Sequence, residues 1–123
     1  MEQKFIKCNT CGTMINYIDE KATPVCCGEP MVAAEYATGH EATHVPVYEI
    51  NGTKVKVTVG DGTHPITADH HIQWVSLESA NCVQRKELSL LDEIVDILFM
   101  IPKDDELQSI HVYCNKHGLY KNA

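Results

Sequence analysis

The stretch Val45–Val59, VPVYEINGTKVKVTV, is the part of the sequence that decides the fold. Near its centre is Asn51-Gly52, a dipeptide that strongly favours a tight hairpin turn between two strands. In the returning strand, Lys54–Val59, lysines and valines alternate, so that one face is charged and the other apolar. The pattern predicts a β-hairpin whose valine face packs on a core.

Further strand candidates lie outward from this hairpin. Gly60-Asp61-Gly62 turns the chain again, and His71–Leu77 and Ile110–Tyr113 have the composition of strands. Several short strands separated by frequent turns predict an all-β fold, either a sandwich or a barrel.

The segment Glu87–Phe99 is compatible with two structures. Its spacing predicts an amphipathic helix, because apolar residues recur at helical intervals: Leu91, Ile94, Val95 and Leu98. The alternative is a pair of strands, Gln84–Leu90 and Asp96–Ile101, joined by a short turn. Local periodicity favours the helix but leaves the strands open.

The composition limits the class of protein. With 123 residues, of which 44% are hydrophobic, the chain can hold one ordinary domain, or a small module joined to a modest one. A net charge of −7 argues against a nucleic-acid binder, which needs a basic surface. The longest apolar run, Ile97–Ile101, is far too short to cross a membrane, and Met1–Thr10 lacks the apolar core of a secretion signal. We therefore expect a cytoplasmic protein without a membrane segment.

Six cysteines and seven histidines are the unusual part of this composition. In a cytoplasmic chain, cysteines at this density indicate metal binding more than disulfides. Four of them form a C-x-x-C-G motif followed by an adjacent pair: Cys8, Cys11, Cys26 and Cys27. Four sulfurs in a tetrahedron suit zinc or iron equally, so the spacing leaves the metal open, and disulfides or unrelated thiols are a weaker alternative. Because two adjacent cysteines cannot both bind from a relaxed turn, we expect some distortion.

The four-cysteine segment is too short to fold by hydrophobic burial alone. Below about 40 residues, a chain normally needs a metal, a disulfide or a partner. We therefore predict a metal-dependent module over residues 1–36 and a separate domain over residues 37–123, with a linker at Ala33–Ala42.

A second set of metal-binding residue types is spread over the rest of the chain. Imidazole and thiolate are both good ligands for iron, zinc or copper. A cysteine and a histidine lie three positions apart just before Gly118, where the chain can reverse, and this spacing favours a shared metal. The candidate ligands are His44, His64, His70, Cys114 and His117. Each histidine taken alone is more often an ordinary surface or core residue.

Together these motifs resemble the desulfoferrodoxin family, whose members are two-iron superoxide reductases. The resemblance covers nearly the whole chain, and the motifs follow the family's order: Cys8-x-x-Cys11, Cys26-Cys27, His44-Val45-Pro46-Val47, His64-Pro65 and Cys114-Asn115-x-His117-Gly118. It implies a desulforedoxin- or rubredoxin-like module that binds one iron through its four cysteines, where zinc could substitute. It also implies a neelaredoxin-like domain with an immunoglobulin-like β-sandwich, and strands rather than a helix over residues 87–99.

The resemblance assigns the second set to a second, catalytic iron. Four equatorial ligands would be His44, His64, His70 and His117, and the axial ligand would be Cys114. One octahedral position would stay open opposite the thiolate, where superoxide would be reduced by one electron to hydrogen peroxide. The resemblance further implies an electron donor such as rubredoxin, a homodimer, and a role in superoxide detoxification under oxidative stress.

The chain departs from the family next to the first ligand histidine. The family usually has Glu-Lys there, whereas this chain has Ala42-Thr43. Because the family's lysine attracts the anionic substrate, we predict slower capture of superoxide by this acidic chain. The candidate substitutes are Glu41, Thr43 and Lys116, together with Lys54 or Lys56 if their strand faces the site. The alternative, which is the more common case for such residues, is that Glu41 and Lys116 are solvated surface charges.

Two other functions are compatible with the sequence. One is a non-catalytic, rubredoxin-like electron carrier, and the other is a zinc-binding or metal-sensing module with a degenerate second site. We expect the remaining metal-binding residue types, and the single tryptophan, to be structural. His40, His71 and His111 would be surface or packing residues, Cys82 a half-buried strand residue, and Trp74 part of the core beside the metal loops.

Overall fold

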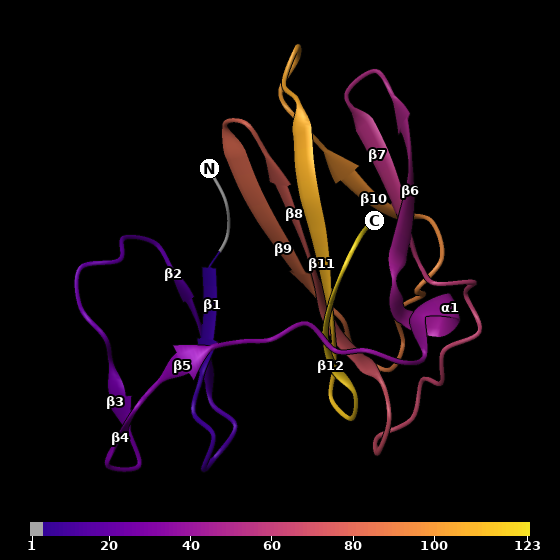
Figure 1. Ribbon diagram of the computed structural model, residues 1–123. Helices are drawn as coiled ribbons and strands as arrows, with labels where there is room; N and C mark the ends of the chain where they lie inside the picture. The colour runs from indigo at the N-terminus through magenta and orange to yellow at the C-terminus, as the bar shows by residue number, and fades with distance from the viewer. Residues whose placement is uncertain (1–3) are drawn as a thin grey trace. The chain divides into compact units, whose positions relative to one another are not determined.

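Strands form almost all of the regular structure in the computed structural model, which describes residues 4–123 (Figure 1). The chain divides between Glu35 and Tyr36 into two units, and each has its own apolar cluster. The first three residues of the predicted N-terminal module lie outside the described residues. Within residues 4–123, no helix is long and apolar enough to cross a membrane. The predicted all-β fold class is confirmed.

The N-terminal unit consists of short strands. They are β1 (Lys4–Lys7), β2 (Met14–Tyr17), β3 (Val25–Cys26), β4 (Glu29–Pro30) and β5 (Val32–Ala33). β1 lies between β2 and β5 in an antiparallel sheet, and β3 pairs with β4 as a two-stranded ribbon. Among the described residues, the buried cluster of this unit consists of Ile6, Cys8 and Met31. So small a core agrees with a module that needs a metal to stay folded.

The C-terminal unit is a sandwich of two antiparallel sheets (Figure 1). One sheet has the strand order β10-β7-β6, and the other has the order β12-β11-β8-β9. The strands are β6 (Pro46–Asn51), β7 (Lys54–Val59), β8 (Ile72–Ser79), β9 (Cys82–Glu87), β10 (Ile97–Met100), β11 (Leu107–Cys114) and β12 (Gly118–Lys121). Of the two architectures that the strand pattern allowed, the chain therefore adopts the sandwich.

The hairpin predicted at residues 45–59 is formed by β6 and β7. Its turn residues are Gly52 and Thr53, because Asn51 still pairs with Lys54. The three valines of β7 are fully buried and its two lysines are exposed, so the alternation predicted the buried face correctly.

Residues 87–99 form no helix. β9 ends at Glu87, a series of turns follows, and β10 pairs with β7. This pairing buries the alternate residues Ile97 and Phe99, whereas Leu91 is 95% exposed. The helix prediction is wrong because partnership with a strand distant in sequence outweighs local spacing. The strand interpretation is confirmed, with a longer connection than the short turn expected.

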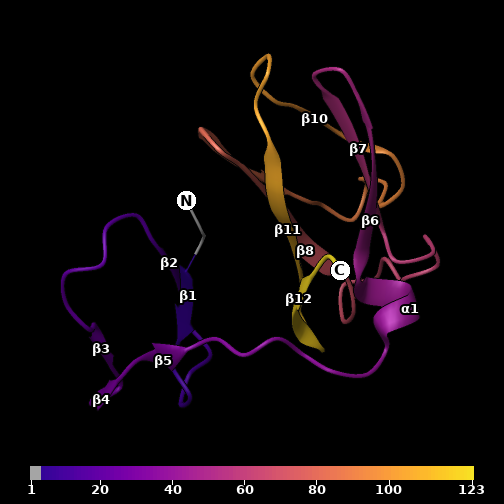
Figure 2. The same ribbon diagram turned by 45° about the horizontal axis from the view of Figure 1, so that its top comes forward.

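A single helical turn, α1 (Glu41–His44), overlaps the end of the segment expected to be a linker, Ala33–Ala42. Figure 2 shows α1 beside the start of β6, at the end of the hairpin opposite the β6–β7 turn. Four residues are too few to produce a periodic signal, so the sequence pattern did not predict this helix.

Candidate metal centres

Five side chains with metal-binding donor atoms gather at one end of the sandwich: His44, His64, His70, Cys114 and His117. Their donor atoms all lie within 4.8 Å of one another. The first comes from α1, the next two from the loop between β7 and β8, and the last two from the end of β11 and the turn before β12. Segments far apart in the sequence thus place four imidazoles and one thiol around a single point.

The backbone holds His44 so that its Nε2 atom belongs to the cluster. The Nδ1 atom lies 2.9 Å from the carbonyl oxygen of His40 and 2.8 Å from the hydroxyl of Thr43. Because a carbonyl oxygen only accepts hydrogen bonds, Nδ1 carries the ring proton and Nε2 keeps its lone pair. His40 presents this carbonyl from a left-handed backbone, with a φ of 60°.

The two histidines of the β7–β8 loop also direct Nε2 to the cluster. His64 donates from Nδ1 to the carbonyl of Pro65 at 2.7 Å, which leaves Nε2 3.4 Å from the sulfur of Cys114. The Nε2 atom of His70 is buried and has no hydrogen-bond partner among the described residues. A buried nitrogen of this kind is costly unless something binds it, and a metal ion would do so.

The remaining distances suit donors arranged around one ion. His117 presents Nδ1, which lies 3.1 Å from Nε2 of His44 and 3.8 Å from the sulfur of Cys114. Two nitrogen ligands bound at about 2.1 Å, at right angles to each other, would lie about 3.0 Å apart. Imidazole and thiolate both suit iron. This set could therefore bind iron, as predicted.

Burial favours the neutral form of three of the imidazoles. It is the main cause that lowers the pKa of His44 to about 4, and it also lowers the pKa values of His64 and His70. Neighbouring histidines add to this effect, since two charged rings would repel each other. Neutral rings are what a metal requires, because a protonated imidazole has no lone pair to offer.

Two backbone irregularities bring the ligand-bearing segments together. Gly60 follows β7 with a φ of 55°, and a Cβ added there would lie 2.2 Å from the carbonyl carbon of Thr43. Its N–H donates to the carbonyl of Val45 at 3.1 Å, so the end of α1 packs on the end of β7. In the other sheet, the pairing of β11 with β8 shifts register between Tyr113 and Cys114. Such bulges re-aim side chains, here the candidate axial thiol.

The second candidate centre lies in the N-terminal unit, where the four predicted cysteines meet. The sulfurs of Cys11 and Cys26 are 3.6 Å apart, and those of Cys26 and Cys27 are 3.9 Å apart. A tetrahedron with metal–sulfur bonds of about 2.3 Å has edges of about 3.8 Å, so this spacing suits zinc or iron. The backbone N–H of Cys11 points at the sulfur of Cys8 at 3.4 Å, which would stabilise a thiolate there.

The adjacent cysteines, Cys26 and Cys27, strain the backbone, whereas the two sulfur–sulfur distances given above are close to those of a regular tetrahedron. Cys27 has a left-handed φ of 53°, so the turn is not relaxed, as expected. The hydroxyl of Thr13, 3.1 Å from the sulfur of Cys11, is the main cause that lowers the pKa of Cys11 to about 6. Neighbouring sulfurs, Cys11 first, raise the pKa of Cys27 to about 12. The four thiols therefore resist losing their protons together unless a cation compensates, which fits a metal site.

The candidate substitutes for the family's Glu-Lys pair take separate places. The carboxylate of Glu41 accepts a hydrogen bond of 2.7 Å from a backbone N–H two residues earlier, which lowers its pKa. The hydroxyl of Thr43 contacts the Nδ1 side of His44, away from the donor cluster. Lys116 is exposed, and its charge adds to burial and the neighbouring histidines in lowering the pKa of His70. Of these three residues, Lys116 thus brings a positive charge to the site.

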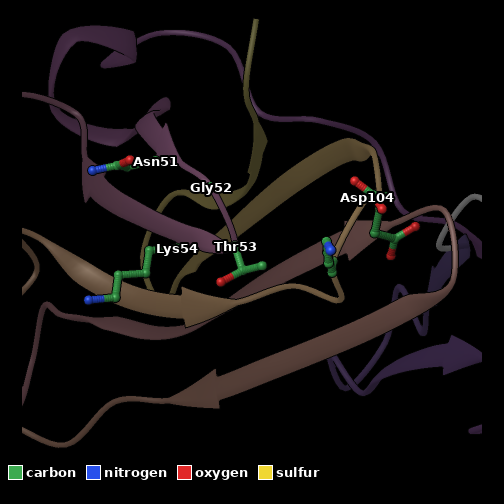
Figure 3. Close-up of a pocket in the computed structure, with 7 residues that line it drawn as sticks. Asn51, Gly52, Thr53, Lys54 and Asp104 are labelled. Carbon is green, nitrogen blue, oxygen red and sulfur yellow. The ribbon is translucent and has the colours of Figure 1, made fainter.

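The two lysines of β7 do not face the donor cluster. Lys54 lies at the β6–β7 turn, where it lines a pocket with Lys103 and Asp104 (Figure 3). Lys56 pairs across the hairpin with Glu49 on the exposed face. Since α1 lies at the other end of this hairpin, neither lysine can substitute for the family's lysine.

Among the other histidines, His40 has a part in the site that the sequence did not indicate. Its carbonyl orients His44, and its ring stacks on that of His117 with centroids 4.3 Å apart. No spacing rule separates it from a surface histidine, because both contacts depend on the fold around α1. His71 is half buried, and His111 is fully buried on the face of β11 opposite the core, where its ring stacks on Tyr36, so these two are packing residues as expected.

The remaining predicted structural residues have different outcomes. Cys82 is half buried at the first position of β9, as expected. Trp74 does not join the core, because alternation along β8 gives that position to Val75. Its ring instead stacks on Tyr113 of the neighbouring strand, with centroids 5.6 Å apart.

A β-sandwich that gathers four imidazoles and a thiol, in a chain with a further cluster of four cysteines, defines a class of metalloproteins with two candidate iron centres. The sequence profile of one family, described as Desulfoferrodoxin, matches residues 36–123. The chain belongs to the desulfoferrodoxin family, so the resemblance inferred from the motifs is confirmed.

Individual relatives match almost the full chain. A desulfoferrodoxin homolog from Archaeoglobus fulgidus is 38% identical over 120 residues, which cover 95% of this chain and 94% of the relative. A desulfoferrodoxin homolog from Methanothermobacter thermautotrophicus is 36% identical, with 95% of both chains covered. The crystal structure of the superoxide reductase from Treponema pallidum is similar with a TM-score of 0.79 and 29% identity, covering 99% of this chain and 98% of that one.

Proposed function

We propose that this chain is a superoxide reductase, which reduces superoxide to hydrogen peroxide. The observation that supports this most is the convergence of five donors: His44, His64, His70, His117 and Cys114. Five protein donors are one fewer than a six-coordinate ion takes, so an ion held here would keep a position for substrate, which distinguishes a catalytic metal site from a closed structural one. The reaction consumes one superoxide, one electron and two protons, and it releases no dioxygen.

The residues around the donor set have separate roles in this reaction. A ferrous ion, when bound, supplies the electron and a binding position for an anion. Three of the histidines, His44, His64 and His70, have lowered pKa values, which favours the neutral form that can bind a metal. Cys114, fully buried, would hold the ion through its sulfur, and a thiolate would donate electron density that favours the oxidised metal. Lys116 attracts the anionic substrate locally, against a net charge of −7.

The rest of the proposal rests on family membership. The module of residues 1–36 holds an auxiliary iron on its four cysteines, which zinc can replace, and residues 37–123 form the reductase domain. An external donor of the rubredoxin type returns the electron. The chain acts as a homodimer in the cytoplasm, where it removes superoxide under oxidative stress.

Metal analysis, visible spectra and superoxide consumption test this function. We expect two irons per chain, a thiolate-to-iron band at each centre, and stopped-flow reduction of superoxide to hydrogen peroxide. His117→Ala is the control, because it removes one nitrogen donor and leaves the four-cysteine set intact. A two-iron protein that consumes no superoxide would instead support an electron carrier. A colourless zinc protein would support a metal-binding or sensing module and would contradict the reductase.

A further inference from the structure

His70 is the candidate ligand whose position depends on a self-contained turn. Thr67 and His70 exchange backbone hydrogen bonds of 3.0 and 3.2 Å. The hydroxyl of Thr67 also contacts the N–H of His70 at 3.1 Å and its carbonyl at 3.2 Å. The ring of His71 adds a bond of 3.0 Å to the carbonyl of Thr67. Because these bonds are internal to the turn, they fix its shape but do not attach it to the sandwich.

Asn115 makes that attachment. Its Oδ1 atom accepts a hydrogen bond from the N–H of His71 at 2.9 Å, and its Nδ2 donates to the carbonyl of Asp69 at 2.9 Å. Its own backbone N–H donates to the carbonyl of His71 at 3.2 Å. Asn115 therefore forms hydrogen bonds with both sequence neighbours of His70, Asp69 and His71.

Asn115 lies between two other candidate ligands in the sequence, so its bonds to residues 69 and 71 connect His70 to those ligands. It directly follows Cys114 and lies two positions before His117, so it belongs to the hairpin that carries two other donors. We infer that Asn115 is a positioning residue that holds His70 within binding distance of the metal shared with Cys114 and His117. Both polar atoms of the Asn115 side chain are used by the bonds to His71 and Asp69, so this residue acts through His70 and not as a ligand. Removing a partner that orients a ligand in this way typically weakens metal binding roughly 10- to 100-fold.

The same hairpin provides a matched control. The Oδ1 atom of Asn122 accepts a bond from the N–H of Ile110 at 2.8 Å, and its backbone N–H donates to the carbonyl of Ile110 at 3.0 Å. Asn122 thus makes the same pair of bonds as Asn115 makes with His71. Its partner is a core residue of β11 that offers no metal ligand.

The test compares Asn115→Ala with Asn122→Ala in the iron-loaded, full-length protein. Iron release to a chelator is followed through the absorption band of the Cys114 thiolate, and the melting temperature is recorded for each variant. We expect release to become roughly tenfold faster in Asn115→Ala. In Asn122→Ala we expect unchanged release, despite a similar loss in melting temperature. Equal release rates in the two variants would overturn the inference.

A His70→Ala background separates positioning from general loosening. If Asn115 acts through His70, then Asn115→Ala causes no further acceleration in that background. An undiminished effect would contradict the positioning role. The inference rests on the proposed iron centre, and superoxide consumption by the unmutated protein is a separate measurement. Iron release that depends on Asn115, in a protein that consumes no superoxide, would refute the proposed function alone. Absence of the thiolate band from the unmutated protein would overturn both.

Discussion

Replacing Gly60 by alanine should separate α1 from the end of β7. The new Cβ would lie 2.2 Å from the carbonyl carbon of Thr43 and 2.6 Å from the carbonyl oxygen of Ala42, both backbone atoms that cannot rotate away. The left-handed φ of 55° costs about 1–2 kcal/mol for a residue with a Cβ. Overpacking typically adds about 1–3 kcal/mol. We therefore expect Gly60→Ala to lower the free energy of unfolding of the sandwich by about 2–5 kcal/mol.

Gly52→Ala is the control for the backbone part of this cost. Gly52 has a similar φ of 65°, but no atom lies within 4 Å of a Cβ added there. It should therefore lose only about 1–2 kcal/mol. Urea unfolding of the metal-free, full-length protein measures both variants through the fluorescence of Trp74, the single tryptophan, which lies in β8.

The same pair of variants tests the link from packing to the metal. Thr43 precedes His44, so displacement of α1 in Gly60→Ala should also weaken iron binding at the second centre, whereas Gly52→Ala should not affect it. Equal losses of unfolding free energy in the two variants would refute the close-packing argument. Normal iron affinity in Gly60→Ala would refute the claim that this contact positions His44.

Three further predictions concern pH, metal removal and substrate capture. Burial lowers the pKa of His111 from 6.5 to about 4. Between pH 6.5 and pH 4, His111 is therefore protonated in the unfolded chain but neutral in the folded chain. The metal-free protein should therefore lose up to about 3 kcal/mol from this group as the pH falls from 7 to 4, and His111→Gln should remove that part of the slope in urea titrations. Identical slopes would contradict this. Cys27→Ser should abolish metal binding in the N-terminal unit, and hydrogen exchange should then show loss of protection in β1 and β2 while the sandwich strands keep theirs. Protected β1 and β2 amides in the metal-free variant would show that the unit folds without metal. Lys116→Glu should slow superoxide capture severalfold in pulse radiolysis, most strongly at low ionic strength. An unchanged rate would mean that another group attracts the anion.

The strands were predictable where the alternation of a segment by itself decides which face is buried. In β7, each valine is buried and each lysine exposed, as the pattern requires. The helix predicted for residues 87–99 was wrong because helical spacing is a local signal. The pairing of β10 with β7 joins positions about 40 residues apart, and it outweighs that signal. α1 was not predictable, because a single turn has no period and its position depends on contact with Gly60 beyond the hairpin.

The candidate ligands were predictable because residue type and spacing carry the signal. Short motifs such as C-x-x-C-G and C-x-x-H-G require no knowledge of the fold. The orientation of each ring was not predictable in the same way. The ring of His44 is set by the carbonyl of His40, which the left-handed backbone of that residue presents, and the place of His70 depends on Asn115. These contacts join residues that no local pattern connects.

The four-cysteine set and the histidine–cysteine set differ in how far apart in the sequence their donor residues lie, and so in the length of the loop that each closes. Cys8 and Cys26 are 18 residues apart, whereas His44 and His117 are 73 residues apart. Longer loops cost more entropy to close, and a chain is synthesised from its N-terminus. During translation, the four-cysteine set is complete soon after its segment leaves the ribosome, while the histidine set must wait for the last hairpin. We therefore expect that a nascent chain stalled before Cys114 could complete the first donor set but not the second.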